Sequence, residues 1–264
     1  MKKLARVSNV IASVPWAIEP RALDLIEAVV QRHLDGEAIP SVEPRPEAGA
    51  ETVAGVAVIP IHGPIIPRAT MMSNVSGATS SEGIQGALML ALNDASVKSI
   101  VLDIDSPGGS VLGGFECADA IHAAAQVKPV VAQVNGICAS LAYLFASQAT
   151  KIVATRGSQV GSIGVIARYY DDKAATHNAG YEEITVASSR EKAMSGMTKE
   201  EITSKLRSEV DRYMGMFTAA ISRGREVDMK KVATGEMWMA DEALGLGLVD
   251  HIGTMADTLG SLGN

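Results

Sequence analysis

Two junctions between a predicted strand and a predicted helix carry the residues best suited to chemistry in this chain. Residues 103–110 run from an apolar strand into a Pro-Gly-Gly sequence, and residues 134–143 place Ser140 at the start of a helix. Backbone N–H groups at such junctions lack helical partners and lie at the positive end of the helix dipole. Together the two junctions predict a serine nucleophile beside an oxyanion hole, which is an arrangement suited to acyl transfer.

The glycine pair and the residue after the serine would form the oxyanion hole. Gly108 lets the backbone approach a ligand closely, and the N–H groups of Gly109 and Leu141 can point at an oxygen that carries developing negative charge. Each junction alone has an ordinary explanation, because glycine pairs form turns and serines cap helices. The sequence around Ser140 also lacks the Gly-x-Ser-x-Gly pattern of the α/β-hydrolases. The functional interpretation therefore depends on both junctions.

A serine needs a base to become a good nucleophile, and none of the five histidines stands in a convincing position. A lysine kept neutral by burial can take that role. Lys192 follows a predicted strand in a loop of small residues that could fold over the cleft, which makes it the preferred candidate. The other lysines after Ser140 include Lys151, Lys173, Lys199 and Lys205. The last two share a helix with several acidic residues and are expected to be solvated.

Composition excludes several other classes of function. The chain has 264 residues, of which 47% are hydrophobic and 20% charged, so it can bury the core of one large α/β domain. A net charge of −7 and 4% aromatic residues argue against nucleic acid as a partner. Two cysteines give no disulfide framework, and no metal-ligand spacing or phosphate-binding loop is present. We expect neither a metal nor a cofactor.

Strands and helices alternate along most of the chain. Strands are predicted at 53–61, 99–104, 130–134, 152–154, 160–166 and 183–187, and a turn at Asn135-Gly136. Helices are predicted at 81–92, 113–125, 140–147, 171–178 and 199–223. Because the connections are long enough for crossover helices, this order predicts an α/β fold with a mostly parallel sheet.

The first fifty residues are expected to form a separate part. Residues 18–35 have the apolar spacing of a helix that stands apart, and the proline-rich stretch 39–51 is typical of a linker, which divides the chain into 1–50 and 51–264. The apolar run at 10–18 is short and contains Pro15, unlike an export signal. The uncharged stretch 129–150 fits a buried strand and helix better than a membrane span. We expect no membrane association.

Four stretches in this order resemble the signal-peptide-peptidase-A-like serine peptidases, and among them the phage head-maturation proteases of the lambda protein C type. They are the glycine-pair motif at 105–110, the nucleophile motif at 139–143, the Gly-Ser-Ile-Gly-Val sequence at 161–165 and a lysine loop at 191–200. The resemblance covers residues 53–252. It implies a crotonase/Clp-protease-like core of ββα superhelical units with an N-terminal helical extension.

The resemblance also implies roles for single residues. Ser140 would be the nucleophile and Lys192 the general base of a Ser-Lys dyad that acts through an acyl-enzyme, with Gly109 and Leu141 as oxyanion donors. Substrate in extended form would bind along Gly108, Gly161, Ser162 and Ile163. Because the lysine must be neutral, a burial-lowered pKa and an activity that rises with pH are expected.

The phage branch of this family implies capsid, scaffold or portal proteins as substrates, in the host cytoplasm or the procapsid interior. Such peptidases resemble ring-forming homo-oligomers. The predicted helix 199–223, with Met214, Met216 and Phe217, could form an interface between copies or face the core of its own domain.

Two alternatives stay open from the sequence. An acyl-coenzyme A hydratase or isomerase of the crotonase type would share the fold and a glycine-rich oxyanion hole, but it would leave Ser140 and Lys192 without a role. A capsid-associated scaffold protein with a relict protease fold would need neither residue. Binding of coenzyme A would favour the first, and processing that is unchanged by Ser140→Ala would favour the second.

Overall fold

The computed structural model describes residues 15–37, 50–69, 77–171, 173–178, 180–182, 184–189, 192 and 196–263. Its main sheet is built on three parallel strands, β3 (Val56–His62), β6 (Ser99–Ser106) and β8 (Val130–Ala139). Their sequences are almost continuously apolar because the strands are buried on both faces. The predicted α/β fold with a mostly parallel sheet is confirmed.

Shorter strands complete this sheet at both ends. β2 (Glu51–Val53) forms a hairpin with β3, while β9 (Lys151–Ala154) and β10 (Gln159–Gly161) pair with successive parts of β8. β11 (Met237–Met239) pairs antiparallel with β10, and β12 (His251–Ile252) pairs with β9. The chain that follows the long helix thus returns to the sheet next to β9 and β10, which themselves flank the strand that leads to Ser140.

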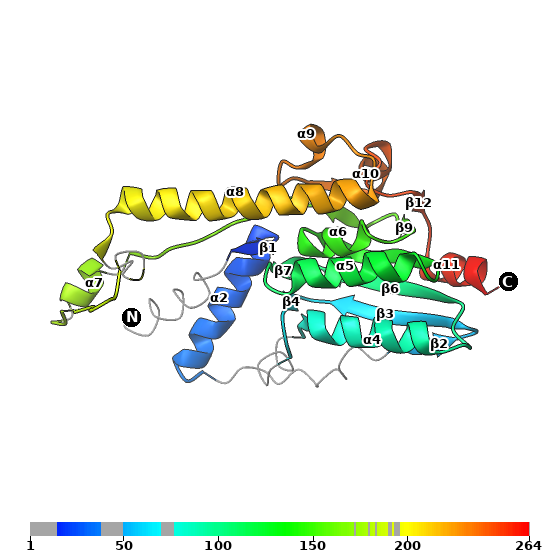
Figure 1. Cartoon of the computed structure of the whole chain (residues 1–264), viewed down its shortest axis with the longest axis horizontal. Coiled ribbons are helices and arrows are strands. Elements are labelled where there is room, and N and C mark those ends of the chain that lie inside the picture. The colour runs from blue at the N-terminus through cyan, green and yellow to red at the C-terminus, as the bar shows by residue number, and fades with distance from the viewer. Residues whose placement is uncertain are drawn as a thin grey trace.

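Helices cover the sheet on both faces. The core cluster lies between the sheet and a helical layer that includes α4 (Ser81–Asn93), α5 (Gly114–Ala125) and α6 (Leu141–Ala146). α11 (Met255–Leu262) covers a smaller apolar cluster of sheet valines. The long helix α8 (Lys199–Gly224) crosses the molecule, with α7 (Lys173–Asn178) at one end and α9 (Met229–Val232) and α10 (Ala240–Gly245) near the other (Figure 1).

A second, smaller sheet joins distant parts of the chain in the order β1-β7-β4-β5. Its strands are β1 (Trp16–Ile18), β7 (Gly108–Ser110), β4 (Ile65–Ile66) and β5 (Thr79–Ser80). β1 leads directly into α2 (Pro20–Leu34), which is the expected N-terminal helix. Because β1 is a strand of this sheet, the expectation that the N-terminal part stands apart is wrong for residues 15–37. The expected linker lies almost entirely outside the described residues.

Several predicted boundaries are also wrong. The stretch expected as one strand at 53–61 is the β2–β3 hairpin, and β8 continues through Asn135-Gly136 where a turn was expected. There the pairing of β8 with β6 shifts register, so an irregularity takes the place of the turn. β10 ends at Gly161, and residues 184–187 form no strand. In α8, Phe217 is buried in the core, while Met216 is exposed.

Candidate active site

Ser140 occupies a strained turn between β8 and α6. Its backbone has φ +54° and ψ −116°, and among the described residues that are not glycine, Ala54 and Ser162 are the others with positive φ. Such conformations cost on the order of 1–3 kcal/mol and cluster at functional sites. The Ser140 side chain is completely buried, and its Oγ donates a hydrogen bond to the Gly164 carbonyl at 3.2 Å. A sharp strand-to-helix turn is one way to present a serine nucleophile.

The short helix that follows Ser140 is fixed by buried contacts. Tyr143 donates a hydrogen bond from its hydroxyl to the Leu248 carbonyl at 3.1 Å. Burial raises the pKa of the Tyr143 hydroxyl, so it stays a proton donor. A Cβ on Gly114 of α5 would lie 2.7 Å from the Leu141 side chain, so this glycine lets α5 and α6 approach closely. These contacts fix the direction of the N–H groups at the start of α6.

Gly108 lies directly against the start of α6. It has φ +94°, and a Cβ there would lie 2.3 Å from the Ala17 carbonyl oxygen and 3.0 Å from the Leu141 nitrogen. Its N–H donates to Ser106 Oγ at 3.2 Å, and that hydroxyl donates to the Gly63 carbonyl at 2.7 Å. The backbone of Gly108 is thus held beside the first N–H of the helix, which has no partner within the helix.

Gly109 lies between strands β1 and β4. It pairs with Ala17 of β1 and with Ile65 of β4, and a Cβ there would lie 1.9 Å from the Ile65 carbonyl oxygen. Hydrogen-bonded pairs recur at every second residue of an antiparallel ladder. The bond from Glu19 N–H to the Pro107 carbonyl, 2.8 Å, therefore directs the Gly109 N–H at Ala17. Gly109 as an oxyanion donor stays a prediction, and in this structure Gly108 is the glycine that contacts Leu141.

The stretch expected to bind substrate is largely internal. Gly161 lies between β8 and β11 and accepts a hydrogen bond from Ser140 N–H at 2.8 Å. Ser162 N–H donates to the Glu236 carbonyl at 2.6 Å, and Ile163 accepts from Gly235 N–H at 3.2 Å. These groups position Ser140 and leave no open strand edge at 161–163.

Two residues just beyond that stretch were missed by the sequence reasoning. The Gly164 carbonyl accepts the Ser140 hydroxyl, and Ile166 pairs with Trp16 through two backbone hydrogen bonds of 2.8 and 2.9 Å. Gly164 belongs to the Gly-Ser-Ile-Gly-Val sequence, and Ile166 is the last residue of the strand predicted at 160–166. Gly161 thus pairs with strands of the main sheet, whereas Ile166 pairs with β1, and Gly161 as a substrate-binding residue stays a prediction.

Lys192 is exposed, and its backbone N–H donates a hydrogen bond to the Ser189 carbonyl at 3.2 Å. It belongs to the segment between α7 and α8, which lies at the end of α8 farthest from α6 (Figure 1). The expectation that Lys192 is buried is wrong for the single chain. The described residues do not bring its amine to Ser140.

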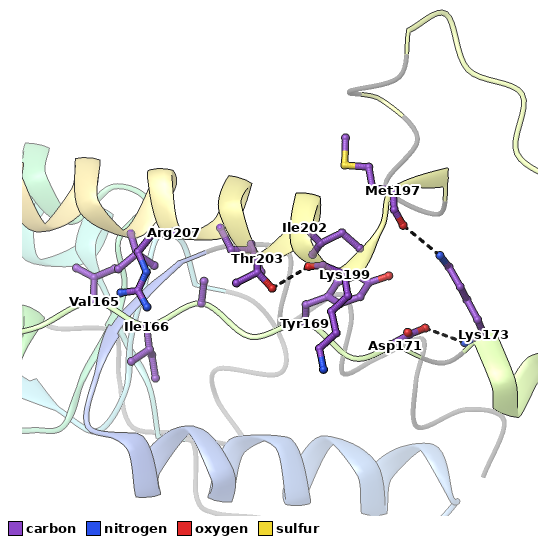
Figure 2. Close-up of a pocket in the computed structure, with 13 residues that line it drawn as sticks. Val165, Ile166, Tyr169, Asp171, Lys173, Met197, Lys199, Ile202, Thr203 and Arg207 are labelled. Atoms are coloured by element: carbon purple, nitrogen blue, oxygen red, sulfur yellow. Dashed lines mark hydrogen bonds between the residues drawn. The ribbon is translucent and has the colours of Figure 1, made fainter.

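A cavity of about 580 Å³ lies between the first half of α8 and the stretch that follows Gly164 (Figure 2). It begins at Val165 and Ile166 and extends to Lys173, whose amine donates to the Met197 carbonyl at 3.4 Å. Ser140 and Lys192 are not among its lining residues. The cavity therefore continues from the Ile166 pairing position toward the segment that carries Lys192.

Side chains that could bind a metal ion include those of His, Cys, Asp and Glu, and the chain has two cysteine thiols. In the described ranges, no group of three or more His, Cys, Asp or Glu side chains could hold a metal ion. Cys117 and Cys138 are buried, and burial raises the pKa of both thiols. A thiol in such surroundings is a poor nucleophile.

Comparison with known proteins identifies the family. The sequence model of peptidase family S49 matches residues 122–263, more than half of the chain. This chain belongs to peptidase family S49. The matched region contains Ser140 and Lys192, and a model of the Clp proteases matches residues 67–160, which include the glycine pair. The predicted resemblance to signal-peptide-peptidase-A-like peptidases is confirmed.

Relatives from phages match most of the chain. It is 30% identical over 254 residues to the capsid assembly protease C of Escherichia phage lambda, covering 94% of this chain and 57% of that protein. It is 32% identical over 221 residues to the head-tail preconnector protein GP5 of Enterobacteria phage P21, covering 81% of this chain and 44% of that protein. The chain thus spans about half the length of these curated relatives.

Among the solved structures that the chain matches is a putative enoyl-CoA hydratase/isomerase (crotonase) from Legionella pneumophila. The TM-score is 0.49 at 15% sequence identity, covering 81% of this chain and 74% of that one.

Within the described ranges, none of the helices combines the length and apolar character that crossing a bilayer requires.

Proposed function

We propose that this chain is a serine endopeptidase whose nucleophile is Ser140. The observation that carries the proposal is the strained, buried Ser140 between β8 and α6, with the Leu141 N–H and the Gly108 backbone beside it. Membership of peptidase family S49 supports a peptidase over other acyl-transfer enzymes. The names of the phage relatives support capsid-related proteins as substrates during head maturation.

The reaction would proceed through an acyl-enzyme. Ser140 Oγ attacks the peptide carbonyl carbon while a base accepts its proton, and the carbonyl oxygen becomes an oxyanion. The Leu141 N–H and an N–H of the glycine pair stabilise that charge, because fixed donors need no reorganisation during the reaction. The base then returns the proton to the leaving amine, and water hydrolyses the ester and restores Ser140.

We further propose Lys192 as the base of a Ser-Lys dyad. A lysine in water has a pKa of about 10.4 and is protonated at neutral pH, so the base must be desolvated where it acts. Lys192 is exposed on a segment that extends away from α6, so the dyad requires this segment to pack against a Ser140 site. That site belongs either to the same chain or to a second copy in a homo-oligomer.

The test is co-expression with candidate capsid and scaffold proteins, followed by mass measurement of the products. We expect Ser140→Ala and Lys192→Ala to abolish processing, while Lys151→Ala, at another exposed lysine, leaves it unchanged. Processing that persists in Ser140→Ala would refute the nucleophile.

Mixing the two inactive variants tests where the base comes from. Product formed by Ser140→Ala together with Lys192→Ala would show that one copy supplies the serine and another the lysine. If Lys151→Ala is inactive and Lys192→Ala is active, Lys151 replaces Lys192 as the base.

A further inference from the structure

Strand β7, which carries the glycine pair, has a neighbour on each edge. β4 and β5 occupy one side, and β1 occupies the other, pairing Ala17 with Gly109 and Ile18 with Gly108. Ile65 of β4 is fully buried in the core. An extended peptide can therefore pair with β7 only where β1 now lies.

The opposite edge of β1 is paired as well. Trp16 N–H donates to the Ile166 carbonyl at 2.8 Å, and Ile166 N–H donates to the Trp16 carbonyl at 2.9 Å. Ile166 lies two residues after Gly164, which accepts the Ser140 hydroxyl. β1 thus lies between the glycine-pair strand and the stretch that contacts the proposed nucleophile. An extended substrate can bind to strand edges through backbone hydrogen bonds of the same kind.

β1 also comes close to the Leu141 N–H, the proposed oxyanion donor. The Ala17 carbonyl oxygen and the Leu141 nitrogen both contact the position that a Gly108 Cβ would take. Ala17 is completely buried, and so is Ser140. A substrate carbonyl that is to meet the Leu141 N–H needs the space beside Gly108, where the Ala17 carbonyl now lies.

A cluster of charged and polar side chains holds the helix behind β1 to the same stretch. Arg168 Nη1 contacts Asp24 at 2.7 Å and Glu27 at 3.3 Å, and the Tyr170 hydroxyl donates to Glu27 at 2.8 Å. Asp24 and Glu27 belong to α2, directly after β1. The cluster therefore keeps β1 at a high local concentration beside its groove.

We infer that residues Trp16–Ile18 are a built-in occupant of the substrate groove, bound as an extended substrate would be, and that they must leave before a protein substrate can enter. The inference rests on the proposed peptidase function. The occupant regulates access to the proposed active site. The ligand of the groove is an extended polypeptide that runs antiparallel to β7. Departure of β1 would also release the Gly109 N–H, which was expected to serve the oxyanion hole.

Ala17→Pro in the full chain tests the occupant directly. Proline lacks the N–H that the ladder directs at Gly109, and its ring does not fit the buried Ala17 position. Leu25→Ala, at an exposed site of α2, is the matched control. The probes are a fluorophosphonate that labels Ser140, read by mass spectrometry, and a fluorescent peptide of sequence Pro-Trp-Ala-Ile-Glu, read by anisotropy.

We expect Ala17→Pro to be labelled faster by about fivefold or more, the factor that loss of one backbone hydrogen bond produces. It should bind the peptide, which should slow its labelling, whereas the unmodified chain and Leu25→Ala should bind none. Should Ala17→Pro fail to fold, Arg168→Gln releases α2 without changing β1 and is expected to shift both readouts in the same direction.

The inference would be overturned if Ala17→Pro and Arg168→Gln were labelled at the same rate as the unmodified chain and neither variant bound the peptide. Failure of the proposed function gives a different result, because then no variant is labelled at Ser140. Peptide binding by Ala17→Pro would still support occupation of the groove in that case, and its absence would refute it.

Discussion

The backbone strain at Ser140 makes a prediction that separates its conformation from its chemistry. Both Ser140→Ala and Ser140→Gly remove the hydroxyl and its bond to the Gly164 carbonyl, so they lose the same polar contact. They differ in the backbone, because alanine keeps the strained φ of +54° while glycine adopts it without steric cost. We expect the glycine variant to be the more stable of two inactive proteins.

The magnitude follows from two opposing terms. Relief of a strained conformation contributes about 1–3 kcal/mol, and the greater freedom of glycine in the unfolded chain costs about 0.5–1 kcal/mol. Ser140→Gly should therefore exceed Ser140→Ala in the free energy of unfolding by about 1 kcal/mol, between limits of about 0 and 2.5 kcal/mol. For a chain of this size the melting temperatures should differ by several degrees, at about 2–4 °C per kcal/mol.

Ser147 provides a matched control at the other end of α6. It is equally buried, but its φ of −63° and ψ of −18° are helical, and its hydroxyl donates to the Leu144 carbonyl. Here Ser147→Gly should be less stable than Ser147→Ala by about 0.5–1 kcal/mol. Urea unfolding of the four variants measures both differences. Equal signs at the two positions would refute the argument that Ser140 is strained.

Three further outcomes follow from the structure. Gly108→Ala should lower the rate of phosphonate labelling about 100-fold or more, because its Cβ would lie 2.9 Å from the Ala139 carbonyl oxygen and 3.0 Å from the Leu141 nitrogen and so displace the proposed oxyanion donor. Burial acts to raise the pKa of Asp250, but its hydrogen bonds with Arg225 and a backbone N–H outweigh burial and lower it. The ionised Asp250 carboxylate therefore stabilises the fold at pH values above the pKa that it has in the unfolded chain. This stabilisation is lost as the pH falls through the lower pKa that Asp250 has in the folded chain. Asp250→Asn should cost about 1 kcal/mol at neutral pH and flatten the acid limb of a urea midpoint-against-pH curve, and an unchanged curve would contradict this. Tyr143→Phe should cost about 1–3 kcal/mol in chemical denaturation, because it leaves a buried carbonyl unpaired.

The sequence predicted most elements because their signals are local. The helices at 81–92 and 199–223 were found to within one or two residues, since both begin at good caps and carry a regular apolar face. Ser140 at a strand-to-helix turn was also predictable, because a buried strand and a buried helix follow each other with no charge between them. What local signals determine is the type and order of elements.

The features that were missed depend on non-local pairing. The Asn135-Gly136 sequence is typical of a turn, but β8 continues through it because its pairing with β6 shifts register there. The stretch Trp16–Ile18 has no strand periodicity of its own and becomes a strand because Gly108–Ser110 and Ile166 lie on either side of it. These contacts join residues about 30 positions apart between β6 and β8 and about 90 to 150 positions apart at β1, so a local window of sequence does not show them.

The stretch from Gly164 to Lys173 connects every part that the proposed reaction requires. It accepts the Ser140 hydroxyl at Gly164, pairs with β1 at Ile166 and holds α2 through Arg168. At Lys173 it enters α7, beyond which lies the segment with Lys192. In the single chain Ser140 is buried, β1 lies in the proposed substrate groove and Lys192 is exposed. Because this stretch contacts Ser140 and β1 and is joined to the segment that carries Lys192 by the Lys173–Met197 hydrogen bond, we expect opening of the proposed groove and assembly of the proposed dyad to be coupled.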